Sequence, residues 1–395
     1  MSENSRVYLD WAAATPLSDA AFLAMQPYFS ADFGNAGAIH KEGIVAKKAV
    51  ETAREQVAKA VQVKPEFVTF TGGGTEGNNL AILGAVEAVV LRGKTYSDIE
   101  VVTTKIEHPS VMKVMNKLSG LGVGVKFVEV KEDGRVDLES LRNTLSPKTV
   151  LFSVAYANSE IGTIQPLHAI SKILKTGEEN YGSKIFFHVD AAQAPLWLNC
   201  QFDSTQADLL TLDFAKCCGP KGVGALVRSR RVEVLPNVFG GGQEAGLRPG
   251  TENVPGIVGA SVAMSEAQAG WKERVERVSK VRDEAIEVLC KEVPELFLNG
   301  ASGENRLANN INISIPGLDT EFAAVVLDSK GFAVSTKSAC AGAGGGESVV
   351  VKEISSDPAR ASSTLRFSLG PDTKIEDLKK LAEALKQHLE KMKGV

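Results

Sequence analysis

The sequence predicts an α/β fold with a mostly parallel sheet flanked by helices, followed by a smaller α+β unit at the carboxyl end. Two observations carry this prediction. Short apolar runs rich in β-branched residues alternate with stretches of helical periodicity, which is the pattern of βαβ units. The segment 240–256 is then too rich in glycine and proline to form a helix or a strand, and it marks the end of the larger unit.

The first unit begins with a short extended segment that is broken at Pro16. A helix is predicted over about 44–61, where apolar residues recur at helical spacing. An apolar strand, a glycine loop and a long helix follow between Phe67 and Val90. The strand-like runs that complete the sheet are 100–104, 126–130, 149–156, 184–190, 207–212 and 223–227.

The second unit begins with one long amphipathic helix, predicted from about Pro255 to Leu289. Strands and helices of ordinary length follow it, at 309–317, 319–331, 333–340, 362–370 and 374–392. We therefore predict a large domain over 1–256 and a small domain over 257–395. The first 18 residues are a candidate to pack with the small domain.

Composition excludes several classes of protein. A hydrophobic content of 44%, a charged content of 23% and a net charge of -4 describe an ordinary globular chain without the basic field that nucleic acid requires. No apolar run reaches the roughly 18 residues of a membrane span, and the first residues lack a signal-peptide pattern. Five cysteines without a CxxC pair predict a reducing, cytoplasmic environment and no metal site.

Lys216 is the residue around which the first unit is organised. An apolar run (208–212) leads to it, and a turn containing Gly219 and Pro220 follows. A lysine fixed in a desolvated pocket has a lowered pKa and can form a Schiff base. The alternative is a solvated lysine in a turn, so the other residues of the chain have to decide between the two.

Polar residues follow several of the predicted strands. They are His108, Asn158, Asp190, Gln193 and Lys216. Ligand sites of parallel sheets form at the carboxyl ends of strands, and core packing does not explain this coincidence. A separate glycine loop, Gly72 to Thr75, precedes a helix and offers backbone N–H groups and a hydroxyl to a phosphate.

Together these residues supply what a pyridoxal 5'-phosphate (PLP) site requires. Lys216 would form the Schiff base, and Asp190 would keep the pyridine nitrogen protonated, which makes the ring an electron sink. His108 would cover the ring face and transfer protons. Each also has a structural alternative, because His108 suits a loop, Asp190 suits a helix cap, and His188 is expected to be a packed strand residue.

Motifs spread along nearly the whole chain give it a resemblance to the cysteine desulfurases of the NifS/IscS type, which are PLP enzymes of the class V aminotransferase family. The motifs are YLDWAAATP, FGNAGAIHKEG, FTGGGTEGNNLAILG, IEHPSV, ANSEIGTIQP, HVDAAQ, KCCGPKGVGAL, GGGQEAGLRPGTEN, STKSACAGAG and STLRFSLG. The resemblance implies the PLP fold-type I architecture. It also implies a homodimer that removes sulfur from L-cysteine for a sulfur-acceptor protein, in iron–sulfur cluster or thio-cofactor assembly.

The resemblance also assigns roles by position. Lys216 matches the Schiff-base lysine, Asp190 the partner of the pyridine nitrogen, and His108 the stacking residue. Gln193 would bond the phenolic oxygen of the cofactor. The phosphate would be held by Gly74 and Thr75, and by Thr251 from the other subunit.

The resemblance places the substrate groups as well. Asn158 and Arg366 match the pair that holds the substrate carboxylate, and Arg366 offers the bidentate fork that a carboxylate needs. Cys340 matches the nucleophilic cysteine that becomes a persulfide while alanine is released. Cys217 and Cys218 are interpreted as small packing residues.

One departure from the family concerns the phosphate. The family carries serine and histidine at the positions of Asp213 and Ala215, where they help to bind the phosphate. Asp213 remains among the predicted cofactor-binding residues, but it brings a carboxylate to a place where a dianion is expected. Its side chain could point away, pair with a base, or bond a backbone amide.

Two other functions stay open at this stage. A selenocysteine lyase or another PLP-dependent β-elimination enzyme uses the same scaffold, although a cysteine in an SAC motif argues against it. A non-catalytic scaffold subunit is the alternative of a different class. Only Asp213 and Ala215 support it, whereas four residues oppose it, namely Lys216, Asp190, Arg366 and Cys340.

Overall fold

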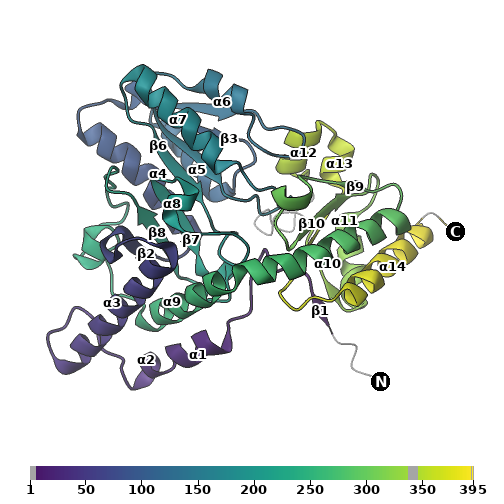
Figure 1. Cartoon of the computed structure of the whole chain (residues 1–395), viewed down its shortest axis with the longest axis horizontal. Coiled ribbons are helices and arrows are strands. Elements are labelled where there is room, and N and C mark those ends of the chain that lie inside the picture. Colours follow the sequence, from purple (N-terminus) through teal and green to yellow (C-terminus); the bar gives the residue numbers. More distant parts are fainter. Residues whose placement is uncertain (1–5, 337–345, 393, 395) are drawn as a thin grey trace.

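The structure, a computed structural model, describes residues 6–336, 346–392 and 394 (Figure 1). Within these residues seven strands form one sheet, in the order β2-β8-β7-β6-β5-β3-β4. The strand β8 is antiparallel to both of its neighbours, and the pairings from β7 through β4 are parallel. The predicted, mostly parallel sheet is therefore confirmed. The bounds are β2 (Val68–Thr71), β8 (Gly224–Arg228), β7 (Leu209–Asp213), β6 (Phe186–Asp190), β5 (Thr149–Ala155), β3 (Glu100–Thr104) and β4 (Gly124–Val128).

Helices cover both faces of this sheet. On one face α4 (Gly74–Leu91) and α5 (Pro109–Gly120) share an apolar cluster with alternate strand residues such as Leu209. The next residue, Leu210, points to the opposite face and joins the cluster that includes α7 (Leu167–Tyr181). This two-residue alternation is the one expected of a strand that is buried on both faces.

Close packing of α4 on β7 fixes the position of that helix on the sheet. A Cβ atom added to Gly77 would lie only 2.7 Å from Cγ2 of Thr211, so glycine lets the helix lie close to the sheet. The amino end of α4 therefore comes to the carboxyl end of β7. This is the edge at which the functional groups were predicted.

Two predicted helices differ in detail from the observed ones. The helix α3 spans Lys41–Val61 and starts three residues before the predicted position, because the His40 side chain accepts the N–H of Gly43 as an N-cap. The single helix predicted over 255–289 is wrong. Two helices are observed, α9 (Val254–Ala269) and α10 (Trp271–Glu292), because the backbone leaves helical geometry at Gly270.

The second unit contains a small antiparallel sheet in the order β12-β10-β9, among the residues described. The bounds are β12 (Thr364–Ser368), β10 (Asn310–Ser314) and β9 (Phe297–Leu298). The helices α10, α11 and α14 pack together on this unit, and Figure 1 shows α14 beside α10 at the end away from the large sheet. The further helices are α1 (Asp19–Met25), α2 (Pro27–Ser30), α6 (Leu138–Thr144), α8 (Phe202–Thr205), α11 (Thr320–Ser329), α12 (Val349–Ser355), α13 (Pro358–Ser362) and α14 (Ile375–Met392).

The amino-terminal strand connects the two units. β1 (Val7–Tyr8) pairs in parallel with β11 (Phe332–Ala333), and Asp10 then bridges to Ser368. The predicted boundary at residue 256 stays a prediction. The helix α9, which begins near that boundary, packs against α1 and α3 of the large unit. None of the helices described is both long and apolar enough to span a membrane.

Candidate active site

A cavity that is partly open to solvent lies at the carboxyl edge of the large sheet. The loops after β5, β6 and β7 and the amino ends of α4 and α5 border it. It brings together most of the predicted site residues, namely Gly74, Thr75, His108, Asn158, Asp190, Gln193, Asp213, Lys216 and Arg366. Cys340 lies outside the described residues, and Thr251 is exposed and does not line this cavity.

Lys216 ends a single 3₁₀ turn, Phe214–Lys216, that directly follows β7. Its Nζ donates a hydrogen bond to the carbonyl oxygen of Ala13, which comes from the amino-terminal segment. Gln193, on the loop after β6, donates to the neighbouring carbonyl of Ala12 at 3.0 Å. The amino-terminal segment therefore positions two of the predicted cofactor ligands.

Asp190 ends β6 and is 6% exposed. Its Oδ1 accepts the N–H of Ala192 at 3.0 Å, and its Oδ2 accepts Nδ2 of Asn78 at 2.7 Å. Burial raises the pKa of Asp190, and these two hydrogen bonds oppose that rise. A cation placed beside this carboxylate would also oppose the rise in the pKa of Asp190. The carboxylate would in turn stabilise the cation.

His108 is the N-cap of α5, and its orientation is fixed by Ser110. Nδ1 of the imidazole accepts the backbone N–H of Ser110 at 3.1 Å and lies 2.7 Å from the Ser110 hydroxyl. An accepting Nδ1 leaves the proton of the neutral ring on Nε2. Burial lowers the pKa of His108, Asp190 opposes this effect, and Lys216 lowers the pKa further.

The sequence did not single out Asn78 and Ser110, although they connect the two residues just described. Nδ2 of Asn78 donates both to Asp190 and to the Ser110 hydroxyl, the latter at 2.8 Å. One hydrogen-bonded chain therefore joins Asp190 to His108. A signal was present, because Asn78 follows Gly74 by four residues and so lies on the same face of the helix.

Arg366 reaches the cavity from β12 of the small unit and is 2% exposed. Its Nη2 lies 2.7 Å from Oδ1 of Asp10, and its Nη1 donates to the carbonyl of Ser159 at 3.0 Å. Its buried Nε has no hydrogen-bond partner among the residues described. A guanidinium held by two of its nitrogens is pre-oriented to bind a carboxylate.

Asn158 is already engaged by the backbone around it. Its Oδ1 accepts the N–H groups of Glu160 and Ile161 at 2.9 and 3.0 Å, and its Nδ2 donates to the carbonyl of Ile106 at 2.8 Å. An amide carries two N–H hydrogens, so Asn158 can offer a substrate one further hydrogen bond.

A second buried carboxyl group, Glu107, precedes His108 and was also missed. It accepts hydrogen bonds from the Thr104 hydroxyl at 2.6 Å and from the N–H of Ala155 at 2.7 Å. Burial, with a smaller contribution from Asp190, raises the pKa of Glu107 to about 8. Glu107 is therefore mainly protonated at pH 7, and it adds little negative charge beside Asp190.

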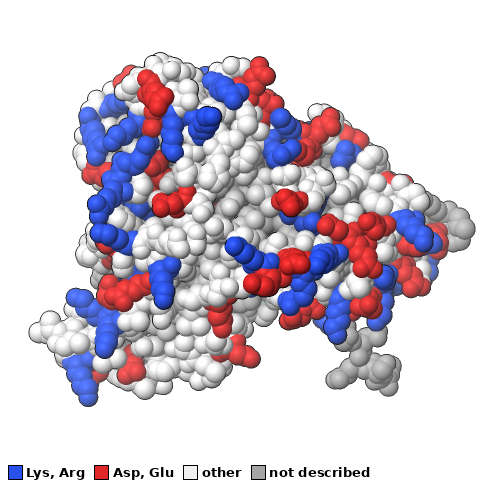
Figure 2. Space-filling model, viewed as in Figure 1, with Lys and Arg blue, Asp and Glu red and all other residues white. Residues whose placement is uncertain are grey.

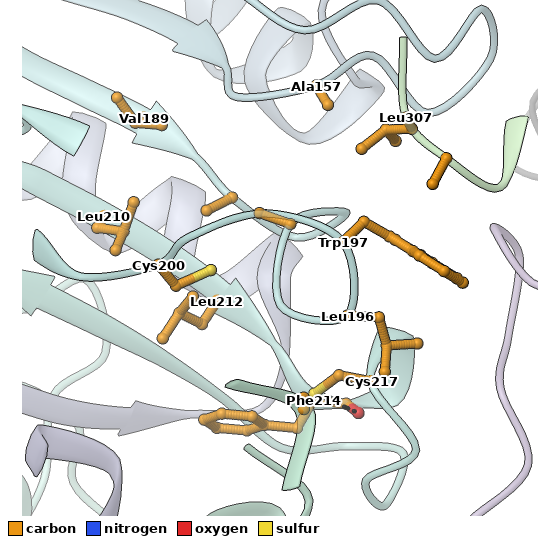
Figure 3. Close-up of a cluster of buried hydrophobic side chains, with 14 of the residues drawn as sticks. Ala157, Val189, Leu196, Trp197, Cys200, Leu210, Leu212, Phe214, Cys217 and Leu307 are labelled. Atoms are coloured by element: carbon orange, nitrogen blue, oxygen red, sulfur yellow. Dashed lines mark hydrogen bonds between the residues drawn. The ribbon is translucent and has the colours of Figure 1, made fainter. Parts of the chain in front are cut away.

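Cys200 and Cys217 are buried and pack among apolar side chains (Figure 3). Burial raises the pKa of both Cys200 and Cys217, so both are protonated thiols at neutral pH and poor nucleophiles. His188 is also fully buried between Ser153 and Thr211, and burial lowers its pKa to about 3. It is a packed strand residue, as the sequence predicted.

Comparisons with known proteins agree with this geometry. The aminotransferase class-V family matches residues 7–381. The cysteine desulfurase IscS of Dictyoglomus turgidum is 38% identical over 98% of this chain and 96% of its own length. A solved NifS-like protein superposes with a TM-score of 0.88 at 31% identity, over 97% of this chain and 99% of that one.

A further solved structure, titled "SspA in complex with cysteine", has a TM-score of 0.76 at 30% identity, over 92% of this chain and 99% of that one. The family match and the near-complete coverage of these relatives confirm the resemblance that the motifs indicated. The chain belongs to the aminotransferase class-V family and, within that family, to the cysteine desulfurases of the NifS/IscS type.

Proposed function

We propose that this protein is a PLP-dependent cysteine desulfurase that converts L-cysteine to alanine and leaves the sulfur as a persulfide on Cys340. The observation that carries the proposal is that Lys216, Asp190 and Arg366 come from different elements and border one cavity. An amine, a buried carboxylate and a buried guanidinium are the groups needed for an aldehyde cofactor, its ring nitrogen and an amino-acid carboxylate.

The cavity suits the ring of the cofactor. Asp190 is oriented by Asn78 and Ala192, and the buried Oδ1 of Asn78 lacks a hydrogen-bond partner within the described residues. Lys216 would hold the aldehyde carbon, and Asp190 the ring nitrogen. Gln193 would hold the phenolic oxygen, His108 the ring face, and Gly74, Thr75 and a partner's Thr251 the phosphate. When bound, PLP supplies the electron sink that stabilises negative charge at the substrate Cα.

The residues of the chain bind the substrate and move its protons. Arg366 holds the substrate carboxylate, with one N–H from Asn158 as a second donor. Lys216 Nζ and His108 Nε2 carry protons to and from substrate atoms. In the overall exchange, the substrate C–S bond breaks and a bond forms between that sulfur and the Cys340 sulfur. The substrate carbon receives a proton, so that cysteine and a thiol become alanine and a persulfide.

We also propose a homodimer, which is supported by an apolar surface on the large unit. The exposed side chains include Phe22 (51%), Phe29 (65%), Phe33 (70%) and Ile39 (96%), all near α1 to α3. Figure 2 shows few charges on the part of the surface that α1 and α9 form in Figure 1. Several large exposed apolar side chains on consecutive elements are typical of a protein interface. A second copy on this face would also give Thr251 a partner site to complete.

The decisive experiment compares Cys340→Ser with Cys290→Ser, because Cys290 is an exposed cysteine outside the cavity. The Cys340 variant should keep the absorbance spectrum of the bound cofactor and lose persulfide and alanine formation, since an alcohol is a far weaker nucleophile than a thiolate. The Cys290 variant should keep both. Alanine formed at the normal rate by Cys340→Ser would contradict the proposal and would point to another lyase chemistry. Absence of a bound-cofactor spectrum in the parent would indicate a scaffold subunit.

A further inference from the structure

The carboxylate of Asp213 lies at the amino end of α4, where the phosphate of the proposed cofactor would bind. Its Oδ2 accepts the N–H of Gly74 at 3.2 Å, and its Oδ1 accepts the N–H of Ala215 at 3.0 Å. Asp213 lines the same cavity as Lys216. Of the three orientations that the sequence left open, the structure therefore has the one in which the carboxylate bonds backbone amides.

The surrounding backbone holds this carboxylate in place. Asp213 is the last residue of β7 and pairs with Gly224 of β8. A Cβ atom on Gly224 would come within 2.6 Å of the Gly73 backbone, so the glycine loop lies against this strand pair. A Cβ atom on Gly74 would lie 3.2 Å from Oδ2 of Asp213. The loop, the strand end and the carboxylate thus form one tightly packed corner.

A second carboxylate near the loop behaves differently. Glu76 accepts the N–H of Gly72 at 2.8 Å, but its other oxygen receives a hydrogen bond from Nε of Arg248 at 3.0 Å. The charge of Glu76 is therefore balanced by a guanidinium. The two hydrogen bonds of Asp213 come from neutral backbone groups, so they leave its negative charge in place.

We infer that Asp213 acts as a built-in anion at the phosphate subsite and lowers the preference of this chain for a phosphorylated cofactor over its unphosphorylated form. The inference rests on the proposed function, because it concerns the same cofactor site. The amino end of a helix carries a partial positive charge of about half a unit. In α4 the carboxylate of Asp213 already interacts with this charge through the N–H of Gly74. An incoming phosphate has to share or displace that contact, and it is repelled by the carboxylate.

The test compares two ligands that share the ring and the aldehyde, PLP and pyridoxal. Equilibrium dissociation constants are measured by absorbance titration of the cofactor-free full-length protein, its Asp213→Asn variant and an Asp137→Asn control. Asp137 caps α6 through the N–H groups of Glu139 and Ser140, so the control loses an equivalent carboxylate cap away from the cavity. Free pyridoxal cyclises in solution, and this lowers its apparent affinity by the same factor for every variant. A change between variants in the ratio of the two dissociation constants therefore reports the contribution of the phosphate.

Asp213→Asn should bind PLP about tenfold or more tightly than the parent does, the change expected from relieving one charged contact. Its affinity for pyridoxal should change less than about twofold, because pyridoxal has no phosphate for the carboxylate to repel. Asp137→Asn should leave both constants unchanged. Asp213→Ser is measured in parallel and should shift the ratio in the same direction, so a folding defect in one variant does not decide the outcome.

Two results would overturn the inference. One is an unchanged ratio of constants in both Asp213 variants, and the other is equal tightening of PLP and pyridoxal. Either result leaves the proposed function intact, because desulfuration is assayed separately at saturating PLP. If neither the parent nor the variants bind PLP, the cofactor assignment itself fails, and the inference fails with it.

Discussion

Replacing Glu107 with glutamine should change how the stability of the protein depends on pH. The Glu107 carboxyl is 7% exposed, and its two oxygens accept hydrogen bonds from Thr104 and Ala155. Glutamine has the same shape and keeps the acceptor oxygen for Ala155, and its N–H can donate to Thr104 once that hydroxyl rotates to accept. The substitution therefore removes one titration and preserves the packing.

The sign follows from the two pKa values of this carboxyl. Its pKa is raised from 4.5 to about 8 in the folded protein. Between these values the unfolded chain has released the proton and the folded chain retains it, so stability falls as pH rises from 4.5 to 8. The loss is complete above pH 8, where both states are ionised. For a fully buried group this shift corresponds to a loss of up to about 5 kcal/mol.

The assay is urea unfolding of the parent, Glu107→Gln and a Glu139→Gln control at several pH values between 5 and 8. Glu139 is an exposed glutamate of α6. The free energy of unfolding of Glu107→Gln should rise relative to the parent as pH increases, whereas Glu139→Gln should run parallel to the parent. An infrared band of a protonated carboxyl group at pH 7 should be present in the parent and absent in Glu107→Gln. If the free energies of unfolding of the parent and Glu107→Gln depend on pH in the same way, Glu107 is not a protonated buried carboxyl group in the folded protein.

Three further predictions concern the substrate, the phosphate loop and the dimer. Arg366→Lys should raise KM for L-cysteine at least about tenfold with a smaller loss of kcat, because a lysine cannot form the two-nitrogen fork; equal kcat and KM values to the parent would contradict the assignment. Gly224→Ala should push Gly73 away and weaken PLP binding in a titration, whereas Gly120→Ala, which faces open space, should have no effect. Ile39→Asp should produce monomers in light scattering with little change in thermal stability, because that side chain is 96% exposed in the single chain.

The sequence predicted the cavity well because its residues follow strand ends. Asp190 and Lys216 each come after a buried apolar run, and parallel strands bring their carboxyl ends to one edge. The convergence of these residues therefore follows from the strand pattern without any knowledge of loop conformation. The same reasoning failed for 255–289, where one glycine inside an otherwise helical pattern breaks the helix at Gly270.

The residues that orient the site were not predicted, because their positions depend on packing. Asp10 reaches Arg366 only because the amino-terminal segment passes between the two units after β1 pairs with β11. Ser110 contacts His108 through the cap geometry of α5. Neither contact has a sequence spacing that would distinguish it from a surface polar residue.

The helix α4 explains why two aspartates in one cavity have opposite effects on a ligand. Its first N–H group holds Asp213, and Asn78, one turn later and about 6 Å along the axis, holds Asp190. The helix thus orients both carboxylates from one rigid element. Asp190 would meet the ring nitrogen, a cation that its charge stabilises, whereas Asp213 would meet a phosphate that its charge repels. Removing the charge of Asp213 should therefore tighten PLP binding, whereas removing that of Asp190 should weaken the protonation of the ring, although both are buried or partly buried acids at strand ends.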